Sequence, residues 1–336
     1  MKLLHRTQHA CLRGSKRAQR GAALLAAMLT VTLVASFAAA AAWQQWRAVE
    51  IEAAERQRVQ TGWLLVGALD WTRIILREDC RPCSADHLAE PWAVPLQESR
   101  ISSFLAADKN NTALTAGEDD VELFLSGQIV DMQSRLNVLN LVNGGKISAT
   151  DLSSFSKLFA MLNLDQTELF SLSDNLLNAT LATTPINSNQ PLPLLPQRVA
   201  QLTWLGISSN TLEKLKPFIT VLPVRTPVNI NTAPAEVLYA SVPSLDLSGA
   251  RLLESRRAQK HFSSIADAEQ LIPAIAGQMG QDHSIATRFF EIRGRVRLAE
   301  TVVQERSLVQ RDGLTVKTLW RERATLPKFE AQASLQ

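Results

Sequence analysis

The longest apolar run of the chain covers residues 22–42, and residues 21–46 contain no charged side chain. About 20 helical residues cross the hydrocarbon core of a bilayer, because a helix rises about 1.5 Å per residue. Six Lys and Arg residues and no acidic residue precede the run, and the positive-inside rule then places this leader in the cytoplasm. The pattern predicts one membrane span, with the bulk of the chain on the other side.

Three alternatives exist for the processing of this run. A secretory signal would be cut at the small residues 38–42, but the run is longer than the 7–15 residues of an ordinary signal core. A plain anchor would remain uncut. Cleavage before the run would keep the helix, and this alternative depends on a motif that is described below.

The helix is predicted to continue beyond the membrane as far as residue 78. Residues 43–78 contain no proline, and the charged residues Asp70, Arg73 and Arg77 fall on one stripe of a helix. The remaining surface is widely apolar, as expected of a spine helix that packs on a sheet. The alternative is a separate core helix that follows a linker.

Alternation of apolar and polar residues predicts β-strands in two separate parts of the chain. The first part has strands at residues 101–106 and 121–142. The second part has strands at 290–298 and 302–310, then a turn at 311–313 and a last strand that ends at 320.

A mostly helical block, residues 146–282, separates the two strand regions. Each of its helices is expected to start at a side chain that can cap the free N–H groups of the first turn. The expected starts are Asp151, Asp165 with Glu168, Asn210, Thr232 before Pro234, Ser248, and Ser264 with Asp267. The predicted fold class is α+β: a long N-terminal transmembrane and spine helix, then an antiparallel β-sheet domain that a mostly α-helical insertion interrupts.

These patterns divide the chain into six successive segments. They are a basic leader (1–21), a transmembrane and spine helix (22–79), the first part of the α/β domain (80–142), the inserted α-helical domain (143–283), the second part of the sheet (284–322) and a C-terminal tail that is expected to be disordered (323–336).

Composition and charge exclude several classes of protein. Apolar residues make up 46% and charged residues 20% of the 336 residues, which is ordinary for a folded chain and excludes a multi-span membrane protein. Without the six leader charges the net charge of +3 becomes −3. The folded part therefore has no excess of basic charge that would indicate a nucleic-acid partner.

The residues that usually carry catalysis are sparse in this chain. His5 and His9 lie in the leader, and we predict that His87, His261 and His283 are scattered surface residues. No Gly-rich phosphate loop, G-x-S-x-G or H-E-x-x-H motif occurs in the sequence. Because an enzyme needs a convergent set of acid, base or nucleophile groups, we predict that the chain is not an enzyme.

Cys80 and Cys83 form a C-x-P-C motif immediately after the predicted spine helix. A redox pair normally precedes a helix, whose N-terminal dipole lowers the thiol pKa, and no second cysteine pair is present to complete a zinc site. We expect a local structural disulfide in an oxidising compartment. Two free thiols and a catalytic pair are the alternatives.

Residues 16–26 carry the most specific motif, KRAQRG followed by AALLA. It resembles the class III leader of type IV pilin-like proteins. The resemblance implies that prepilin peptidase cuts between Gly21 and Ala22 and that Ala22 becomes the N-methylated N-terminus. Most such proteins have Glu at the fifth mature position, where this chain has Ala26. In this departure the chain resembles one subgroup of these proteins, the general secretion pathway protein K family of type II secretion minor pseudopilins.

Two further blocks, residues 86–92 and 131–140, resemble signatures of the same family. The second usually reads D-x-x-G-R-x-N-[LI]-N. This chain has serine in place of the glycine and one additional residue before the last asparagine. We expect Asp131, Arg135 and Asn137 to form a buried polar network that fixes a strand turn, rather than a catalytic site.

Residues 227–238, PVNINTAPAEVL, resemble the start of a helix-hairpin-helix repeat. A DNA-binding hairpin needs a G-x-G turn whose N–H groups meet a phosphate, whereas this chain has Asp246 there. We therefore expect a helix-hairpin-helix or SAM-like packing module and no nucleic acid. The residues that carry the likeness are Asn229, Asn231, Thr232 and Leu238. The basic residues that follow, which we expect on a solvated helix face, are Arg256, Arg257 and Lys260.

The resemblance implies a structural minor pseudopilin at the tip of the type II secretion pseudopilus, which serves the export of folded proteins from the periplasm. The implied partners are the minor pseudopilins I and J, the major pseudopilin, the inner-membrane assembly platform and prepilin peptidase. The implied location is the inner membrane, with one span and a periplasmic bulk, before assembly into the tip. Calcium binding is also implied, and the oxygen-rich loops 108–111 and 118–120 are candidates without assigned ligands.

Two other functions stay open at this point. One is a membrane-anchored helix-hairpin-helix receptor for DNA binding or uptake. The other is a minor pilin of a true type IV pilus.

Overall fold

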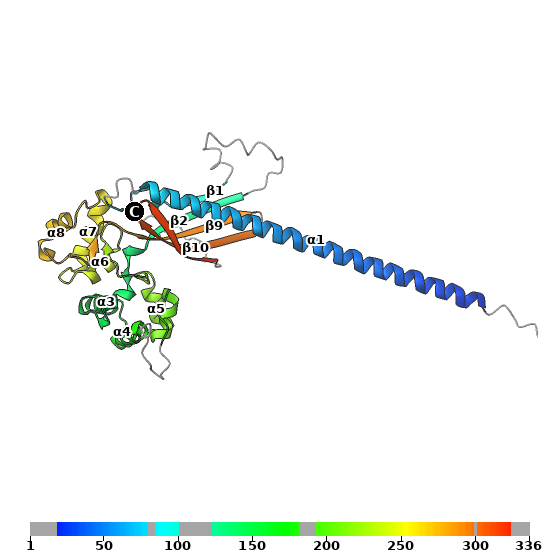
Figure 1. Cartoon of the computed structure of the whole chain (residues 1–336), viewed down its shortest axis with the longest axis horizontal. Helices are drawn as coiled ribbons and strands as arrows, with labels where there is room; N and C mark the ends of the chain where they lie inside the picture. Colours follow the sequence, from blue (N-terminus) through cyan, green and yellow to red (C-terminus); the bar gives the residue numbers. More distant parts are fainter. Residues whose placement is uncertain (1–18, 80–84, 101–122, 182–192, 299–300, 324–336) are drawn as a thin grey trace, which may run out of the picture. The chain divides into compact units, whose positions relative to one another are not determined.

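The computed structural model describes five stretches of the chain (Figure 1). They are residues 19–79, 85–100, 123–181, 193–298 and 301–323. The predicted strand at 101–106, Cys80, Cys83, the two candidate calcium loops and residues 324–336 lie outside them. The chain divides into two compact units, residues 1–59 and 60–336, and each is described by itself.

The first unit contributes most of helix α1, which runs from Gln19 to Asp79. Residues 21–59 are exposed throughout. By length and composition, this is the one helix among the described residues that could cross a membrane, with a mean hydropathy of 2.2 over its most apolar 18 residues. The prediction that the helix continues past the apolar run is confirmed.

A five-stranded antiparallel sheet forms the centre of the second unit, with the order β1-β2-β9-β10-β11. The strands are β1 (Leu96–Arg100), β2 (Leu123–Asp131), β9 (Phe289–Leu298), β10 (Thr301–Asp312) and β11 (Thr315–Arg323). Asp131 at the end of β2 pairs with Phe290 near the start of β9. The insertion therefore leaves and re-enters the sheet at neighbouring positions, and the predicted α+β fold with an interrupted sheet is confirmed.

Three predicted limits of the strands are wrong. The strand expected at 121–142 ends at Asp131, where the side-chain carboxylate accepts a hydrogen bond from Gln133 N at 2.7 Å and starts a 3-10 turn. The turn expected at 311–313 lies later, because β10 continues to Asp312 and Gly313 takes a positive φ of 58°. Strand β11 includes Arg323, at which the tail was predicted to begin.

The last turns of α1 pack on one face of the sheet. Leu65, Leu69 and Leu76 are fully or almost fully buried there against apolar residues of β2, β9 and β10. The close approach depends on glycine, because a Cβ atom on Gly294 of β9 would lie 2.8 Å from Leu65 Cδ1. The face of α1 that is buried is narrower than the wide apolar surface predicted from the sequence, because Trp63 remains 72% exposed.

The insertion contains six α-helices in the described part of the chain. They are α3 (Ala149–Met161), α4 (Gln166–Leu181), α5 (Ser209–Leu215), α6 (Ala235–Ser241), α7 (Leu247–Gln259) and α8 (Ile265–Leu271). Two-residue strands link the segments around them: β3 (Leu136–Asn137) with β6 (Ile219–Thr220), β4 (Val142–Asn143) with β5 (Lys146–Ile147), and β7 (Val228–Asn229) with β8 (His283–Ser284). The short 3-10 helices are η1 (Pro91–Ala93), η2 (Met132–Ser134), η3 (Val138–Leu141), η4 (Val199–Leu205) and η5 (Pro273–Ile275).

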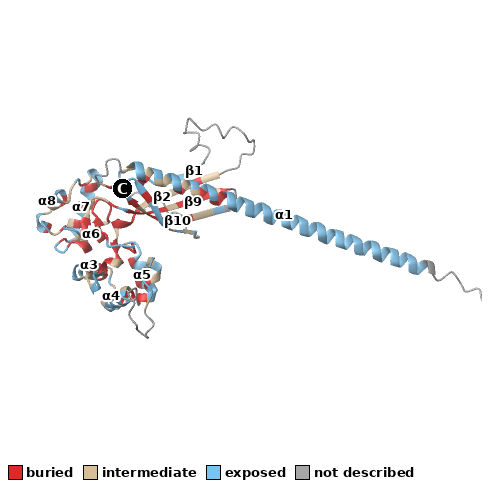
Figure 2. Cartoon of the chain, viewed as in Figure 1, coloured by how far each residue is buried: buried red, intermediate tan, exposed pale blue. Residues whose placement is uncertain are grey.

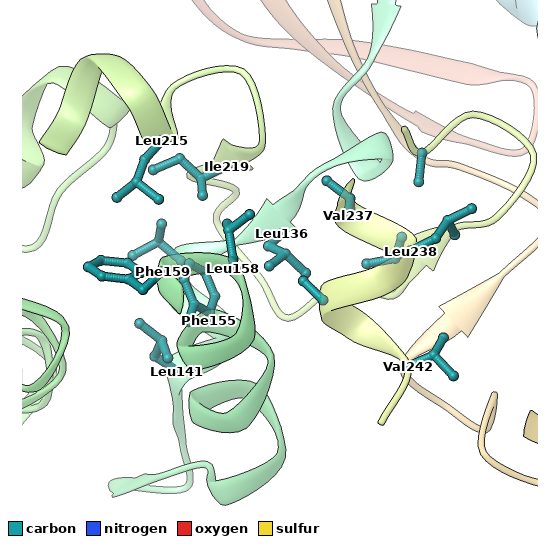
Figure 3. Packing of buried hydrophobic residues seen from close by; sticks show 14 of the residues in the cluster. Leu136, Leu141, Phe155, Leu158, Phe159, Leu215, Ile219, Val237, Leu238 and Val242 are labelled. Atoms are coloured by element: carbon teal, nitrogen blue, oxygen red, sulfur yellow. The ribbon is translucent and has the colours of Figure 1, made fainter. Parts of the chain in front are cut away.

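The helices of the insertion surround an apolar core of their own. Figure 3 shows Phe155, Leu158 and Phe159 of α3 in one cluster with Leu238 of α6. These side chains are at most 1% exposed, and Figure 2 shows the buried residues concentrated between the helices. Burial of this apolar surface is the main force that holds the short helices together.

Several predicted helix starts differ from the observed caps. Asp151, Asn210 and Ser248 lie in the first turns of α3, α5 and α7 instead of before them. The observed caps are Ser148, Ser208 and Asp246, each with extended backbone and a side-chain oxygen that accepts a first-turn N–H.

The remaining predicted starts have mixed outcomes. The capping box of Ser264 and Asp267 on α8 is confirmed. Asp165 accepts a hydrogen bond from Thr167 N at 2.9 Å before α4, but the carboxylate of Glu168 accepts from Ser208 N instead of closing a box. The predicted start at Pro234 is confirmed, because α6 begins directly after it.

Candidate functional site

The predicted processing site lies on the exposed part of α1. Gly21, Ala22 and Ala26 are exposed, and apart from the helix's own backbone and the neighbouring residues no atom of the described part of the chain lies within 4 Å of the position that a Cβ on Gly21 would take. Among the described residues, no other segment therefore packs against Gly21. Cleavage after Gly21 and methylation of Ala22 stay predictions.

A buried carboxylate, Asp131, joins the sheet to the helix-hairpin-helix-like motif. Its Oδ2 accepts hydrogen bonds from Thr232 Oγ1 at 2.5 Å and from Asn229 Nδ2 at 2.9 Å, while its Oδ1 accepts from Gln133 N. Burial is the larger effect and raises the pKa of Asp131, although its hydrogen bonds oppose that shift. Asp131 therefore acts as a structural node between β2 and the insertion.

The asparagines of the VNINTA segment bind backbone groups inside the protein. Asn229 Nδ2 also donates to Asp86 O at 3.1 Å. Asn231 clamps Phe262, because its Nδ2 donates to Phe262 O at 3.0 Å and its Oδ1 accepts from Phe262 N at 2.9 Å. Leu238 is fully buried in the core of the insertion. These motif residues therefore all make contacts inside the protein.

Asp246 and Arg257, which lie where a DNA-binding hairpin would contact phosphate, also make internal contacts. The carboxylate of Asp246 accepts from Gly249 N at 2.7 Å and so occupies the start of α7. Arg257 is not part of a solvated face: its guanidinium is buried and donates to Ile230 O and Ala233 O. That part of the prediction is wrong, because a long side chain on the inner face of α7 satisfies carbonyls of the preceding motif. Arg256 and Lys260 are exposed as predicted.

The second family signature forms separate clamps rather than one network. Asn137 Nδ2 donates to Val224 O at 2.8 Å, and its Oδ1 accepts from Leu222 N at 3.1 Å. Arg135 is half-buried, and burial lowers its pKa despite the nearby carboxylates of Glu291 and Asp131. Asp131 and Asn137 are buried as expected but hold different segments, so the prediction of a single network is wrong.

A buried ion pair holds the end of α1 to the sheet and to the first family signature. The guanidinium of Arg311 on β10 contacts the carboxylates of Asp79 and Asp86 and donates to Thr287 O at 3.1 Å. Asp86 Oδ2 in turn accepts from Thr287 N at 2.7 Å. Burial raises the pKa of Asp79 more than Arg311 lowers it. Sequence spacing could not reveal this cluster, because its members are far apart along the chain.

The three histidines beyond the leader are not scattered surface residues, which corrects the prediction. The rings of His87 and His261 stack with centroids 3.9 Å apart and planes 13° apart. His283 is 5% exposed, and its Nε2 lies 3.1 Å from Ser241 Oγ. Burial lowers the pKa of His283 to about 4. Tertiary contacts between segments distant in sequence bury His283 and bring His87 and His261, which are partly exposed, against each other.

Among the described residues, the only carboxylate group of metal-binding spacing is Asp79, Asp86 and Glu90, whose oxygens lie within 4.8 Å of one another. Calcium requires six to eight oxygen ligands. Two of these carboxylates already contact Arg311, and Glu90 Oε2 accepts from Trp92 Nε1 at 2.7 Å. This group therefore does not fit a calcium site.

Part of the insertion matches a known protein family, and two relatives match most of the chain. Residues 228–285 match the family model described as type II secretion system (T2SS), protein K. The chain is 26% identical over 308 residues to type II secretion system protein K of Pseudomonas aeruginosa, covering 85% of this chain and 86% of that protein. It is 25% identical over 335 residues to the protein of the same name from Pectobacterium carotovorum, covering 90% and 96%.

A solved structure shares the fold. A chain in the crystal structure of the GspK-GspI-GspJ complex of the type 2 secretion system of enterotoxigenic Escherichia coli superposes with a TM-score of 0.55 and 15% identity. The superposition covers 81% of this chain and 98% of the other.

Proposed function

We propose that the chain is a member of the type II secretion system protein K family of minor pseudopilins and that it caps the tip of the pseudopilus. The observation that carries the proposal is the match of 85–90% of the chain to two proteins of that name, together with a family match that falls on the insertion itself. In this role the protein would serve the export of folded proteins from the periplasm across the outer membrane.

Two features of the chain support a terminal position in the filament. Ala26 stands where most pilin-like proteins carry Glu, so this subunit has no carboxylate there to neutralise the N-terminal amine of a neighbour. The insertion adds a separately packed body between β2 and β9, and a body of that size would obstruct the stacking of further subunits above it.

The proposed location and partners follow from the family. The exposed apolar part of α1 is long enough to anchor the protein, and we place that anchor in the inner membrane with the leader cytoplasmic and the bulk periplasmic. The partners are the minor pseudopilins I and J, the major pseudopilin and the assembly platform, with prepilin peptidase as the processing enzyme. The related solved complex contains K, I and J together.

The role is structural rather than catalytic or nucleic-acid-binding. Asn229, Asn231 and Thr232 make internal hydrogen bonds, and Arg257 is buried against backbone carbonyls. A receptor for DNA would need such groups at the surface. Calcium binding remains a proposal from the family alone, and the carboxylates of Asp79, Asp86 and Glu90 are not its site.

Mass spectrometry of the mature chain, purified from membranes, tests the anchoring part of the proposal. We expect the N-terminal peptide to start with methylated Ala22. A Gly21→Val variant should keep its leader, whereas the control Gly67→Ala on the same helix should be processed normally. A mature chain that starts after residue 42, or one that keeps residues 1–21, would contradict the proposal.

Co-purification with tagged minor pseudopilins I and J tests the tip assignment. We expect a complex that contains one copy of this chain and also forms with the Gly67→Ala control. Recovery with type IV pilus components instead would favour the pilus alternative. Binding of duplex DNA whose affinity falls steeply with salt would favour the receptor.

A further inference from the structure

We propose that the arginines on the side of the sheet away from α1 bind a carboxylate-bearing segment of a partner protein, with Arg295 of β9 at the centre of the contact. The occupant is an extended acidic segment that has carboxylates at alternate positions. This inference uses the sheet alone and does not rest on the proposed role at the pseudopilus tip.

The two sides of the five-stranded sheet are covered differently. Leucines of α1 pack on one side, against Leu125 and Val296. On the other side, Leu222 of the insertion packs on Phe289 and Leu308, at the end of the sheet where the insertion joins it. In the described part of the chain, no buried apolar cluster covers the remaining half of this second side.

Arginine dominates that uncovered half, which we call the arginine face. Successive residues of a strand point to opposite sides of a sheet, and directly paired residues point to the same side. Because Gly294 of β9 lies against Leu65 of α1, its neighbours in the strand point away from the helix. The arginine face consists of Arg293, Arg295 and Arg297 of β9, Arg306 of β10 and Arg100 of β1.

The arginine face has more guanidinium groups than carboxylates. The ion pairs on it are Glu291 with Arg293, Glu98 with Arg297 and Glu322 with Arg306. Five arginines and three glutamates give this face a formal charge of +2, whereas the chain without its leader charges carries −3. The local field is therefore opposite in sign to that of the folded part as a whole, and it attracts an acidic partner.

Arg295 has no anionic partner of its own. Among the described residues it makes no hydrogen bond and no ion pair, and its Nε is buried without a partner. The residues that pair with it across the sheet, Ser126 of β2 and Gln304 of β10, are both neutral. A carboxylate accepts two parallel hydrogen bonds from one guanidinium, so an incoming Asp or Glu side chain supplies the anion that this row of the sheet lacks.

Aromatic rings restrict the arginines on either side of Arg295. The guanidinium carbon of Arg297 lies 4.1 Å from the ring centroid of Phe124, and that of Arg306 lies 5.6 Å from the ring centroid of Trp320. Stacking on a ring leaves the N–H groups at the edge of a guanidinium available. The arginine face is therefore partly ordered before a partner binds, which lowers the entropy cost of binding.

The spacing of the arginines selects the shape of the partner. Arg293, Arg295 and Arg297 recur at every second residue of β9, so their Cα atoms are about 6.6 Å apart along the strand. An extended segment has the same period, and carboxylates at its alternate positions would meet successive arginines. A nucleic acid fits less well, because its continuous row of phosphates would also meet the carboxylates of Glu98 and Glu291.

Fluorescence anisotropy of a labelled peptide, SETETETS with both ends blocked, tests the proposal on the whole chain made by cell-free synthesis in detergent. Glutamine replaces the six basic leader residues in every chain, because the leader would itself attract an acidic peptide. We expect binding that weakens as salt is raised. It should weaken at least about tenfold when glutamine replaces the three glutamates of the peptide, since a neutral amide loses the charge-assisted hydrogen bonds.

Arg295→Gln should weaken binding of the peptide at least about fivefold. It should unfold at the temperature of the unmodified chain, because no described residue loses a hydrogen bond or an ion pair. Arg295→Lys keeps the charge without the planar fork and should give an intermediate affinity. The matched control is Arg256→Gln, which removes the same charge from an exposed position of α7 and should leave binding unchanged.

Four outcomes would overturn the proposal. They are no binding of the peptide at low salt, an equal loss in Arg295→Gln and Arg256→Gln, and duplex DNA that binds more tightly than the peptide and also depends on Arg295. The fourth concerns the chain's own carboxylates, which are removed by combining Glu118→Gln, Asp119→Asn and Asp120→Asn. Peptide binding that occurs only in this combined variant would assign the arginine face to a segment of the chain itself instead of a partner.

Discussion

The helix–sheet layer and the helical insertion bury different kinds of side chain in their interiors. Between α1 and the sheet, ionised groups are buried beside leucines: Glu305 is 1% exposed and lies 2.8 Å from Arg321 Nε, and Arg311 is paired with Asp79 and Asp86. The core of the insertion consists mainly of apolar side chains. Its buried polar groups, such as Arg257 and Asn231, bind backbone groups of the insertion itself, and a further set lies at the border with the sheet.

This contrast shows where each region obtains its specificity. A leucine-rich helix can slide on an apolar sheet, whereas a buried ion pair is satisfied in one register only, because an unpaired charge in the interior is costly. The short helices of the insertion pack mainly through apolar contacts, and its buried guanidinium, Arg257, is satisfied by backbone carbonyls rather than by a buried ion pair. The orientation of the insertion relative to the sheet depends on the hydrogen bonds that Asn229 and Thr232 donate to Asp131.

Removal of the buried guanidinium should have the largest effect. Arg311→Met would leave Asp79 and Asp86 without their cation and should lower the free energy of unfolding by about 3–5 kcal/mol. Arg288→Met, which breaks an exposed pair with Asp312, should cost about 0–1 kcal/mol. Chemical unfolding of the whole chain in detergent measures both, and equal losses would remove the distinction between buried and exposed pairs.

A cavity in the core of the insertion should lower the free energy of unfolding slightly less than the loss of the buried guanidinium. Leu238→Ala removes a fully buried side chain and should reduce the free energy of unfolding by about 2–5 kcal/mol. Leu252→Ala on α7, where the side chain is 44% exposed, is the matched control and should change it by less than about 0.5 kcal/mol. If the two variants had the same free energy of unfolding, the insertion would not have a tightly packed core around Leu238.

Acidification should weaken the insertion through His283. Because burial lowers the pKa of His283 from 6.5 to about 4, the unfolded chain takes up a proton below pH 6.5 that the folded chain refuses. This effect does not lower the free energy of unfolding above pH 6.5. As the pH falls from 6.5 to 4, it lowers the free energy of unfolding by about 3 kcal/mol. Unfolding at pH 7.0, 5.5 and 4.5 should show a shallower decline for His283→Gln than for the unmodified chain, and parallel curves would refute this assignment.

The close approach of α1 to the sheet can be tested with glycine. Gly294→Ala would place a methyl group 2.8 Å from the buried Leu65 Cδ1 and should cost about 1–3 kcal/mol through overpacking. Gly67→Ala has free space around it and should stabilise the helix by about 0.5–1 kcal/mol. Thermal unfolding should therefore move in opposite directions for the two variants, and a shift in the same direction would contradict the packing.

The smallest effect is expected at the border between the two regions. Thr232→Val keeps the shape of the side chain but removes the hydroxyl that donates to Asp131, and should cost about 1–2 kcal/mol. Thr318→Val at an exposed position of β11 should be nearly neutral. If Thr232→Val were also neutral, the border would not depend on this hydrogen bond.

Local patterns determined much of the fold. The apolar run predicts the exposed apolar part of α1, and alternation predicts β9, because both signals come from residues that are adjacent in sequence. Helix caps were harder to place: the observed caps of α5 and α7, Ser208 and Asp246, lie two residues before the predicted ones. Several residues near each start can cap, and only the backbone conformation selects one of them.

The sequence by itself determined the anchor, the interrupted sheet and the family signatures, since each of these depends on periodicity or on a contiguous motif. Only the tertiary structure decided that His87 stacks on His261, that Arg311 binds Asp79 and Asp86, and that Arg257 is buried. These contacts join residues that are tens to hundreds of positions apart. Their existence depends on how two separately packed regions meet, which no local pattern of apolar and polar residues encodes.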